Sequence, residues 1–119
     1  MMALLMGVGT ISPADVSRLA REGAARVFDV NLVPSWQRHH VPGAVHLDHA
    51  TFEADDLPAS RDTALVFYCS NPFCRKAPLA ARRAKRFGYA NVRVMSAGIQ
   101  GWLDEGLPTE SAGAEPARP

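Results

Sequence analysis

The chain has 119 residues, of which 47% are hydrophobic and 21% charged, with thirteen basic and twelve acidic side chains. This length suits one domain with a modest core, and the composition excludes a disordered or collagen-like chain. A formal net charge of +1 favours neither a nucleic-acid nor a membrane partner, and two cysteines are too few for a disulfide scaffold. No apolar run approaches the roughly 20 residues that span a bilayer. Residues 1–8 are apolar but lack the basic start of a signal peptide, so we expect a small cytoplasmic domain.

The first half of the chain contains signals for one helix and two short strands. The helix is predicted between Ser12, which can cap its start, and Gly23, which can end it. Residues 25–30 have the apolar character of a mostly buried strand, and residues 45–47 follow a turn and predict a second one. Residues 50–63 are polar, and we expect a loop or a short helix there.

The second half alternates strands and helices more clearly. Residues 64–69 form a continuous apolar run, which is typical of a central parallel strand covered on both faces. A loop over residues 70–76 leads into a helix that starts at residue 77 and ends at Phe87. A last strand is predicted over residues 91–95, followed by a last helix that starts at residue 98.

This alternation predicts an α/β domain with a central, mostly parallel sheet and helices on both faces. We expect a single domain over residues 1–110 and a flexible C-terminal tail over residues 111–119, where the sequence has no periodicity. In such sheets the ligand site lies beyond the carboxyl ends of the strands. That geometry selects Cys69, which ends the clearest strand of the chain.

Cys69 is the candidate nucleophile. If the loop that follows it curls around the sulfur, backbone N–H groups converge on Cys69 and form an anion-binding nest. The dipole of the next helix and the side chain of Arg75 add positive potential at the same point. All of these effects lower the pKa of a thiol, so we predict that Cys69 is substantially ionised at neutral pH. An unpaired cysteine can also be a small core residue, but the strand end, the loop, the Arg and the helix start favour the nucleophile.

Basic side chains gather after this cysteine. Six of them lie within twelve positions that contain no acidic residue: Arg75, Lys76, Arg82, Arg83, Lys85 and Arg86. The patch suits a small anionic substrate better than a long polyanion, although we expect residues 82–86 to form a solvated helix face. The predicted catalytic residues are Cys69 and Arg75. The predicted substrate-binding residues are Ser70, Asn71, Pro72, Phe73, Cys74 and Lys76.

Three separate segments of the chain resemble the signatures of a rhodanese-like domain. Residues 68–75 (YCSNPFCR) resemble the active-site loop of that family, and residues 40–45 (HVPGAV) resemble its upstream signature. Residues 97–102 (AGIQGW), with the GLP that follows at residues 106–108, resemble its closing signature. The segments keep the order of the family and together cover roughly residues 10–110.

The resemblance implies a sulfurtransferase on a rhodanese-like fold. Cys69 would take a sulfane sulfur from a donor such as thiosulfate, forming a persulfide, and pass it to a thiophilic acceptor such as cyanide or a thiol. Arg75 would bind the anionic donor, and the amides of residues 70–75 would hold the substrate and stabilise the persulfide anion. We expect no cofactor, no nucleic-acid or membrane partner, and no metal. The four histidines lack a ligand pattern with the cysteines: His39, His40, His46 and His49.

The chain departs from the family at two positions. Arg75 lies six residues after Cys69, one residue further than in the usual sulfurtransferase loop. In the related cell-cycle phosphatases and arsenate reductases, a loop of this length suits a tetrahedral oxyanion. The Arg that follows the Asp-Val strand in the family is Asn31 here, which puts one supporting ion pair into question.

The longer loop keeps a second hypothesis open, an oxyanion enzyme that is either a Cys-dependent phosphatase or an arsenate reductase. A phosphatase needs a general acid for its leaving group, and the loop contains no carboxylate. Asp48, Asp55 or Asp56 could serve only if the fold brings one of them near. Arsenate reduction needs a second thiol, which Cys74 could supply.

Cys74 has further alternatives. It could attack a persulfide on Cys69 and release sulfide, leaving a disulfide between the two residues, or it could be a loop side chain turned aside. A third hypothesis for the whole domain is a non-enzymatic sulfur carrier or interaction module. We expect His40, Trp36 and Trp102 to be structural residues.

Overall fold

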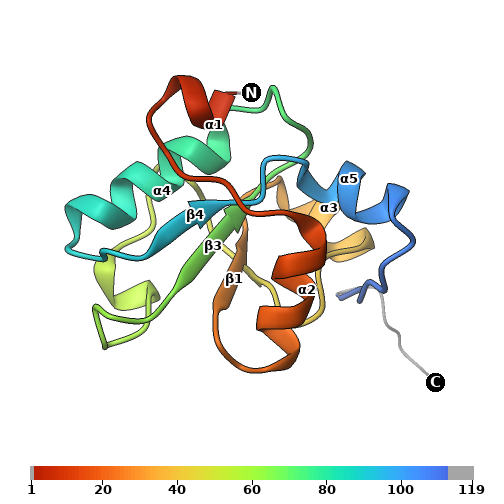
Figure 1. Cartoon of the computed structure of the whole chain (residues 1–119), viewed down its shortest axis with the longest axis horizontal. Helices are drawn as coiled ribbons and strands as arrows, with labels where there is room; N and C mark the ends of the chain where they lie inside the picture. The colour runs from red at the N-terminus through yellow and green to blue at the C-terminus, as the bar shows by residue number, and fades with distance from the viewer. Residues whose placement is uncertain (1, 113–119) are drawn as a thin grey trace.

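The computed structural model describes residues 2–112, and it contains a parallel sheet with helices on both faces (Figure 1). Within these residues the sheet has four strands in the order β2-β1-β3-β4. Their bounds are Arg26–Asp29 (β1), Val45–His46 (β2), Leu65–Tyr68 (β3) and Val92–Val94 (β4). Every strand pair is parallel, so all carboxyl ends lie at the same edge of the sheet. The predicted fold class is confirmed, including the central position of the strand that precedes Cys69.

The helices are those predicted, with two additions. The bounds are Met2–Leu5 (α1), Pro13–Arg21 (α2), Val33–Arg38 (α3), Lys76–Arg86 (α4) and Gly98–Asp104 (α5), with a 3-10 turn at Ala54–Asp56 (η1). The helices α2, α4 and α5 confirm the sequence prediction. The turn η1 lies within residues 50–63, where we expected a loop or a short helix. The helices α1 and α3 were not predicted.

The alternation of side chains along β3 divides the core into two halves. Leu65, Phe67 and Cys69 pack into a cluster that includes residues of α1 and α4. Val66 and Tyr68 point to the other face, into a cluster that includes residues of α2 and α5. Figure 1 shows α4 and α2 on opposite sides of the sheet. All five of these residues are buried, which explains the continuous apolar run in the sequence.

The segment before α2 lies along the outer edge of β4. Thr10 forms a parallel bridge with Val94. The N–H of Val94 donates to the carbonyl of Gly9 at 2.9 Å, and the N–H of Ile11 donates to the carbonyl of Val94 at 3.0 Å. This segment therefore bonds both backbone groups of Val94, on the side of β4 that faces away from β3.

The end of the described chain also pairs with an earlier segment. The backbone of Glu110 exchanges hydrogen bonds with that of His40, at 2.8 and 2.9 Å. Two residues later, the N–H of Ala112 donates to the carbonyl of Gln37 at 2.9 Å. The first part of the predicted tail is therefore bonded to the domain, and the rest of that prediction, residues 113–119, lies outside the described residues.

The three residues predicted to be structural make packing contacts. The ring of Trp36 stacks on that of His40, with 4.6 Å between centroids, and its Nε1–H donates to the carbonyl of Ala44 at 3.0 Å. Trp102 is 1% exposed, and its Nε1–H donates to the carbonyl of Pro108 at 2.8 Å. These contacts hold the turn before β2 and the end of α5 against the sheet.

Candidate active site

Cys69 lies immediately after β3, at the edge of the sheet where the parallel strands end. Its side chain is only 3% exposed. The backbone around it is held by α5, because the N–H groups of Ile99 and Gln100 donate to the carbonyls of Cys69 and Ser70, at 2.9 and 3.1 Å. Two of the predicted family segments, the loop and the closing signature, are thus in direct contact.

Gly98 makes this contact possible. Its φ of +69° lies in the left-handed region, which disfavours other residues. A Cβ at this position would overlap the carbonyl group of Ser70 and lie 2.6 Å from the amide nitrogen of Asn71. Only a residue without a side chain lets the first turn of α5 approach the loop this closely.

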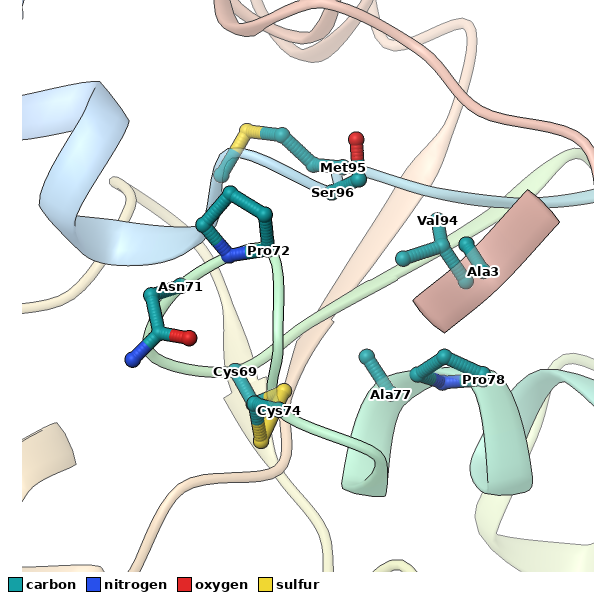
Figure 2. Close-up of a pocket in the computed structure, with 10 residues that line it drawn as sticks. All are labelled: Ala3, Cys69, Asn71, Pro72, Cys74, Ala77, Pro78, Val94, Met95 and Ser96. Carbon is teal, nitrogen blue, oxygen red and sulfur yellow. A yellow bond between two sulfur atoms is a disulfide. The ribbon is translucent and has the colours of Figure 1, made fainter. Parts of the chain in front are cut away.

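The two cysteines of the chain are joined by a disulfide across the loop (Figure 2). Their Cα atoms are 6.4 Å apart, which lies within the usual range for a bridge. Asn71 forms the turn between them: its side-chain oxygen accepts the N–H of Phe73 at 2.9 Å, and its carbonyl accepts the N–H of Cys74 at 3.1 Å. The loop is therefore folded back on itself so that Cys74 meets Cys69.

The bridge occupies the place that the sequence assigned to a substrate anion. The amides of Phe73 and Cys74 were predicted to join a nest around Cys69, but in this form they donate to Asn71. Cys69 has no free thiol here, so the predicted low pKa is a statement about the reduced protein and stays a prediction. The cavity beside the bridge has a volume of about 10 Å³, which is room for about one water molecule.

Arg75 stands at the junction of the loop and α4, as the N-cap residue of that helix. Its side chain is exposed, and within residues 2–112 it forms neither a hydrogen bond nor an ion pair. Its anion-binding role stays a prediction.

The other predicted substrate-binding residues lie around the loop. Phe73 is 76% exposed at the tip of the loop, and the carbonyl of Pro72 accepts the N–H of Met2 at 3.1 Å. Lys76 lines a cleft of about 130 Å³ next to the loop.

The basic face of α4 is mostly solvated, as predicted, with one exception. Arg82, Lys85 and Arg86 are exposed. Arg83 is half-buried instead. Its guanidinium donates to the carbonyl of Phe52 at 2.7 Å and forms an ion pair at 3.7 Å with the carboxylate of Glu53, the N-cap residue of η1. The expectation of a solvated side chain was wrong for Arg83, because its guanidinium also covers the ring of Phe52.

Asn31, which stands where the resemblance implied an Arg, connects the end of β1 to the active-site loop. The hydroxyl of Ser70 donates to its side-chain oxygen at 2.7 Å. The N–H of Asn31 donates to the carboxylate of Asp29 at 2.8 Å, and its carbonyl pairs with Nε2 of His46 at 2.7 Å. The sequence marked Asn31 only as a departure, since no local pattern could show a contact with a residue 39 positions away.

Asp29 is fully buried at the end of β1, and one of its carboxylate oxygens has no hydrogen-bond partner. Burial raises the pKa of Asp29 above its ordinary value of 3.8, against the opposing effects of the Tyr68 hydroxyl and of Asn31. The folded protein therefore keeps this proton to a higher pH than the unfolded chain does. The contribution of Asp29 to stability is present below pH 3.8 and is lost as the pH rises through the raised value.

The Asp29→Asn variant should remove this pH dependence. Relative to the variant, the wild type should be less stable at about pH 7 than at about pH 4, because the unfolded chain gives up the Asp29 proton above pH 3.8 while burial makes the folded protein retain it. Urea unfolding of both proteins at the two pH values measures the change. Asp62→Asn, at an exposed carboxylate, is the matched control. An Asp29→Asn difference that stays constant with pH would contradict the prediction.

The candidate general acids of the phosphatase hypothesis are poorly suited to that role. A hydrogen bond from the amide of Ala50 lowers the pKa of Asp48, which keeps its carboxylate ionised. Asp56 accepts the N–H of Glu53 at 2.8 Å within η1. Asp55 lies on the same exposed turn. None of these three side chains lines the cavity at Cys69.

Two negative observations apply to the part of the chain that the structure describes. No helix between residues 2 and 112 has the length and apolar character needed to cross a membrane. Over the same residues, no three His, Cys, Asp or Glu side chains come together in a way that could hold a metal ion.

Comparison with known proteins identifies the family. The model of the rhodanese-like domain matches residues 12–105, and the chain belongs to this family. It is 29% identical over 100 residues to the HTH-type transcriptional regulator Rv0324 of Mycobacterium tuberculosis, covering 84% of this chain but only 44% of that protein. It is 25% identical over 115 residues to the human thiosulfate:glutathione sulfurtransferase, covering 85% of this chain and 98% of that protein.

Solved structures agree on the fold. The BH2092 protein of Bacillus halodurans superposes with a TM-score of 0.79 at 24% identity, over 87% of this chain and 77% of that one. The matched part of this chain spans less than half the length of the Mycobacterium tuberculosis regulator and nearly the whole length of the human sulfurtransferase. Sulfurtransferases are among its relatives, and the predicted membership of the rhodanese-like family is confirmed.

Proposed function

We propose that this domain is a sulfurtransferase in which Cys69 carries the transferred sulfur as a persulfide. The observation that carries the proposal is the position of Cys69, at the carboxyl end of the central strand and directly before the loop into α4. A nucleophile at this place is adjacent to the backbone amides of the loop and to the N-terminus of α4, both of which stabilise an anionic sulfur. The sulfurtransferase relative supports the same reaction class.

In the first half-reaction the thiolate of Cys69 attacks the outer sulfur of thiosulfate. The bond between the two sulfur atoms of thiosulfate breaks, sulfite leaves with the electron pair, and the persulfide anion remains on Cys69. In the second half-reaction a thiolate or cyanide attacks the outer sulfur of the persulfide, and the thiolate of Cys69 is released. Arg75 and Lys76 are placed to attract the anionic donor, because both lie at the start of α4.

The reaction requires a reduced Cys69. In the bridged form the sulfur of Cys69 is bonded to Cys74 and cannot attack a donor. A compartment that keeps thiols reduced, such as the cytoplasm, therefore suits the domain. The phosphatase alternative is less well supported, because a phosphatase needs a general acid and the ionised Asp48 is unsuited to that role.

Intact-protein mass spectrometry tests the proposal. The protein is first reduced and then freed of reductant, because added thiols or phosphines would remove a persulfide sulfur. Thiosulfate should either leave one added sulfur atom on the wild type as a persulfide, or convert the wild type to the bridged mass with release of sulfide. It should do neither to Cys69→Ser. Cyanide should remove any bound sulfur as thiocyanate.

A matched control separates the active cysteine from a general thiol effect. Cys74→Ser keeps Cys69 and loses the other thiol, so it should still take up one sulfur from thiosulfate. A reduced Cys74→Ser protein that shows no sulfur uptake from thiosulfate, with its Cys69 thiol still titratable, would refute the proposed reaction. Phosphate esters and arsenate would then be assayed on the same sample.

A further inference from the structure

The disulfide leaves little space at the sulfur of Cys69, so the sulfur of Cys74 and any sulfur added to Cys69 would occupy the same place. In the bridged form the sulfur of Cys74 lies against that of Cys69, and about 10 Å³ of space remains at this point. A persulfide on Cys69 adds a sulfur atom to the same crowded site. Figure 2 shows how the loop returns past Asn71 and Pro72 to bring Cys74 back to the end of β3. The second thiol is thus within bonding distance of the first, held there by the turn at Asn71.

We propose that Cys74 is a resolving thiol that discharges the Cys69 persulfide as sulfide and forms the Cys69–Cys74 bridge. The inference rests on the proposed function, since it needs the persulfide as its starting point. It names the reductant of the transferred sulfur, which is a second thiol of this chain, and it makes the bridged structure an intermediate of turnover. The domain would then be a sulfide-releasing enzyme whose co-substrate is a dithiol.

The step balances as an internal thiol–disulfide exchange. The Cys74 sulfur, as thiolate, attacks the inner sulfur of the persulfide, which is Sγ of Cys69. The bond between the two Sγ atoms forms, the bond from Cys69 Sγ to the outer sulfur breaks, and the outer sulfur leaves as HS⁻ with the proton that Cys74 gave up. The outer sulfur is reduced to sulfide, the sulfur of Cys74 is oxidised from thiol to disulfide, and the oxidation state of Cys69 Sγ does not change. An external dithiol then reduces the bridge and leaves as a cyclic disulfide.

The burial of the two cysteines indicates how the bridge reopens. Cys69 is 3% exposed and lies below the loop, whereas Cys74 is half-buried on the returning arm of the loop. An incoming thiolate therefore reaches the sulfur of Cys74 first. Attack there expels Cys69 as the leaving group, which regenerates the nucleophile next to the α4 N-terminus, where an anionic sulfur is stabilised. The mixed disulfide then lies on Cys74, and the second thiol of the dithiol resolves it.

A single-turnover experiment tests the inference. Reduced wild type and Cys74→Ser are each mixed with one equivalent of thiosulfate, without air and without reductant, and are analysed by intact mass and by a sulfide assay. The wild type should reach the mass of the bridged chain and release about one sulfide per chain. Cys74→Ser should keep one added sulfur and release sulfide only at background level. Adding dithiothreitol should return the wild type to the reduced mass.

The outcomes separate this inference from the proposed function. A wild type that holds a stable persulfide and releases no sulfide would overturn the resolving role and leave the sulfurtransferase intact. So would peptide mapping that finds the added sulfur on Cys74, because that result means transfer of the outer sulfur and not resolution. A Cys74→Ser protein that takes up no sulfur would instead refute the persulfide step itself. A parallel sample without thiosulfate must stay reduced, since bridging there would reflect stray oxidation.

Discussion

Replacing Gly98 by alanine should destabilise the protein by about 2 to 4 kcal/mol and strongly reduce sulfur uptake by Cys69. A Cβ at this position would overlap the carbonyl group of Ser70 and crowd the amide of Asn71. Both neighbours are backbone, so the clash cannot be relieved by a side-chain rotation. We expect α5 to move away from the loop, which breaks the hydrogen bonds from Ile99 and Gln100 to the carbonyls of Cys69 and Ser70. Urea unfolding and the thiosulfate mass assay measure the two effects.

Gly106→Ala is the matched control for this substitution. Gly106 lies just beyond the other end of α5 and has nearly the same backbone conformation, with φ +71° against +69° for Gly98. A Cβ on Gly106 would meet nothing within 4 Å. This variant therefore isolates the cost of a left-handed alanine, about 1 kcal/mol, and should keep its activity. Equal effects of the two substitutions on stability and on sulfur uptake would show that the contact with the loop is unimportant.

The Trp102→Ala variant should lose about 3 to 5 kcal/mol of unfolding free energy. The indole is 1% exposed and fills the half of the core that Val66 and Tyr68 share with α2 and α5. Its Nε1–H also donates to the carbonyl of Pro108, which would be left without this partner. Urea unfolding is again the measurement, with the expectation that α5 loosens and that sulfur uptake falls at temperatures where the variant is partly unfolded.

The neighbouring residue provides the comparison. Leu103 follows Trp102 on α5 but is 42% exposed, so Leu103→Ala should change stability by only about 0.5 kcal/mol. Trp102→Phe should fall between the two alanine variants, because it keeps most of the apolar volume and loses the hydrogen bond. If Trp102→Ala were no more destabilised than Leu103→Ala, the packing role of Trp102 would be wrong.

The elements with strong local signals could be predicted from the sequence. Ser12 accepts the N–H of Asp15 at 3.1 Å, as expected of a residue that caps α2. Within the apolar run at residues 64–69, residues 65–69 became β3 and Cys69 because each of these side chains faces a buried cluster on one side of the sheet or the other. In both cases the physical cause lies within a few residues of the signal.

The short helices α1 and α3 had no such signal. α1 has four residues and depends on a distant contact, the hydrogen bond from Met2 to the carbonyl of Pro72. α3 starts after Leu32, which provides no side-chain cap, and none of its residues is buried, so it has no apolar stripe. Only Pro34 in its first turn is typical of a helix start. Helices of this length are set by tertiary contacts more than by propensity.

In the candidate site, too, some features have a local signal in the sequence and others depend on distant contacts. The place of Cys69 at a strand end followed from the order of strands and helices, and the possibility of a bridge to Cys74 followed from the presence of a second thiol in the loop. The supports of the loop did not follow, because they come from elsewhere in the chain. Asn31 reaches Ser70 from the end of β1, and Gly98 approaches it from the start of α5. Such contacts arise only when the sheet brings distant strand ends together.

The pairing of residues 9–11 with β4 protects part of the sheet edge from pairing with other chains. An uncovered edge strand offers its backbone to other chains and can template their aggregation. Here Val94, on the outer side of β4, is already paired with Gly9 and Ile11, and β2, at the opposite edge, is only two residues long. A chain shortened to the residues matched by the family model, which start at residue 12, would lose this cover. Such a fragment would present β4 to a second copy of itself.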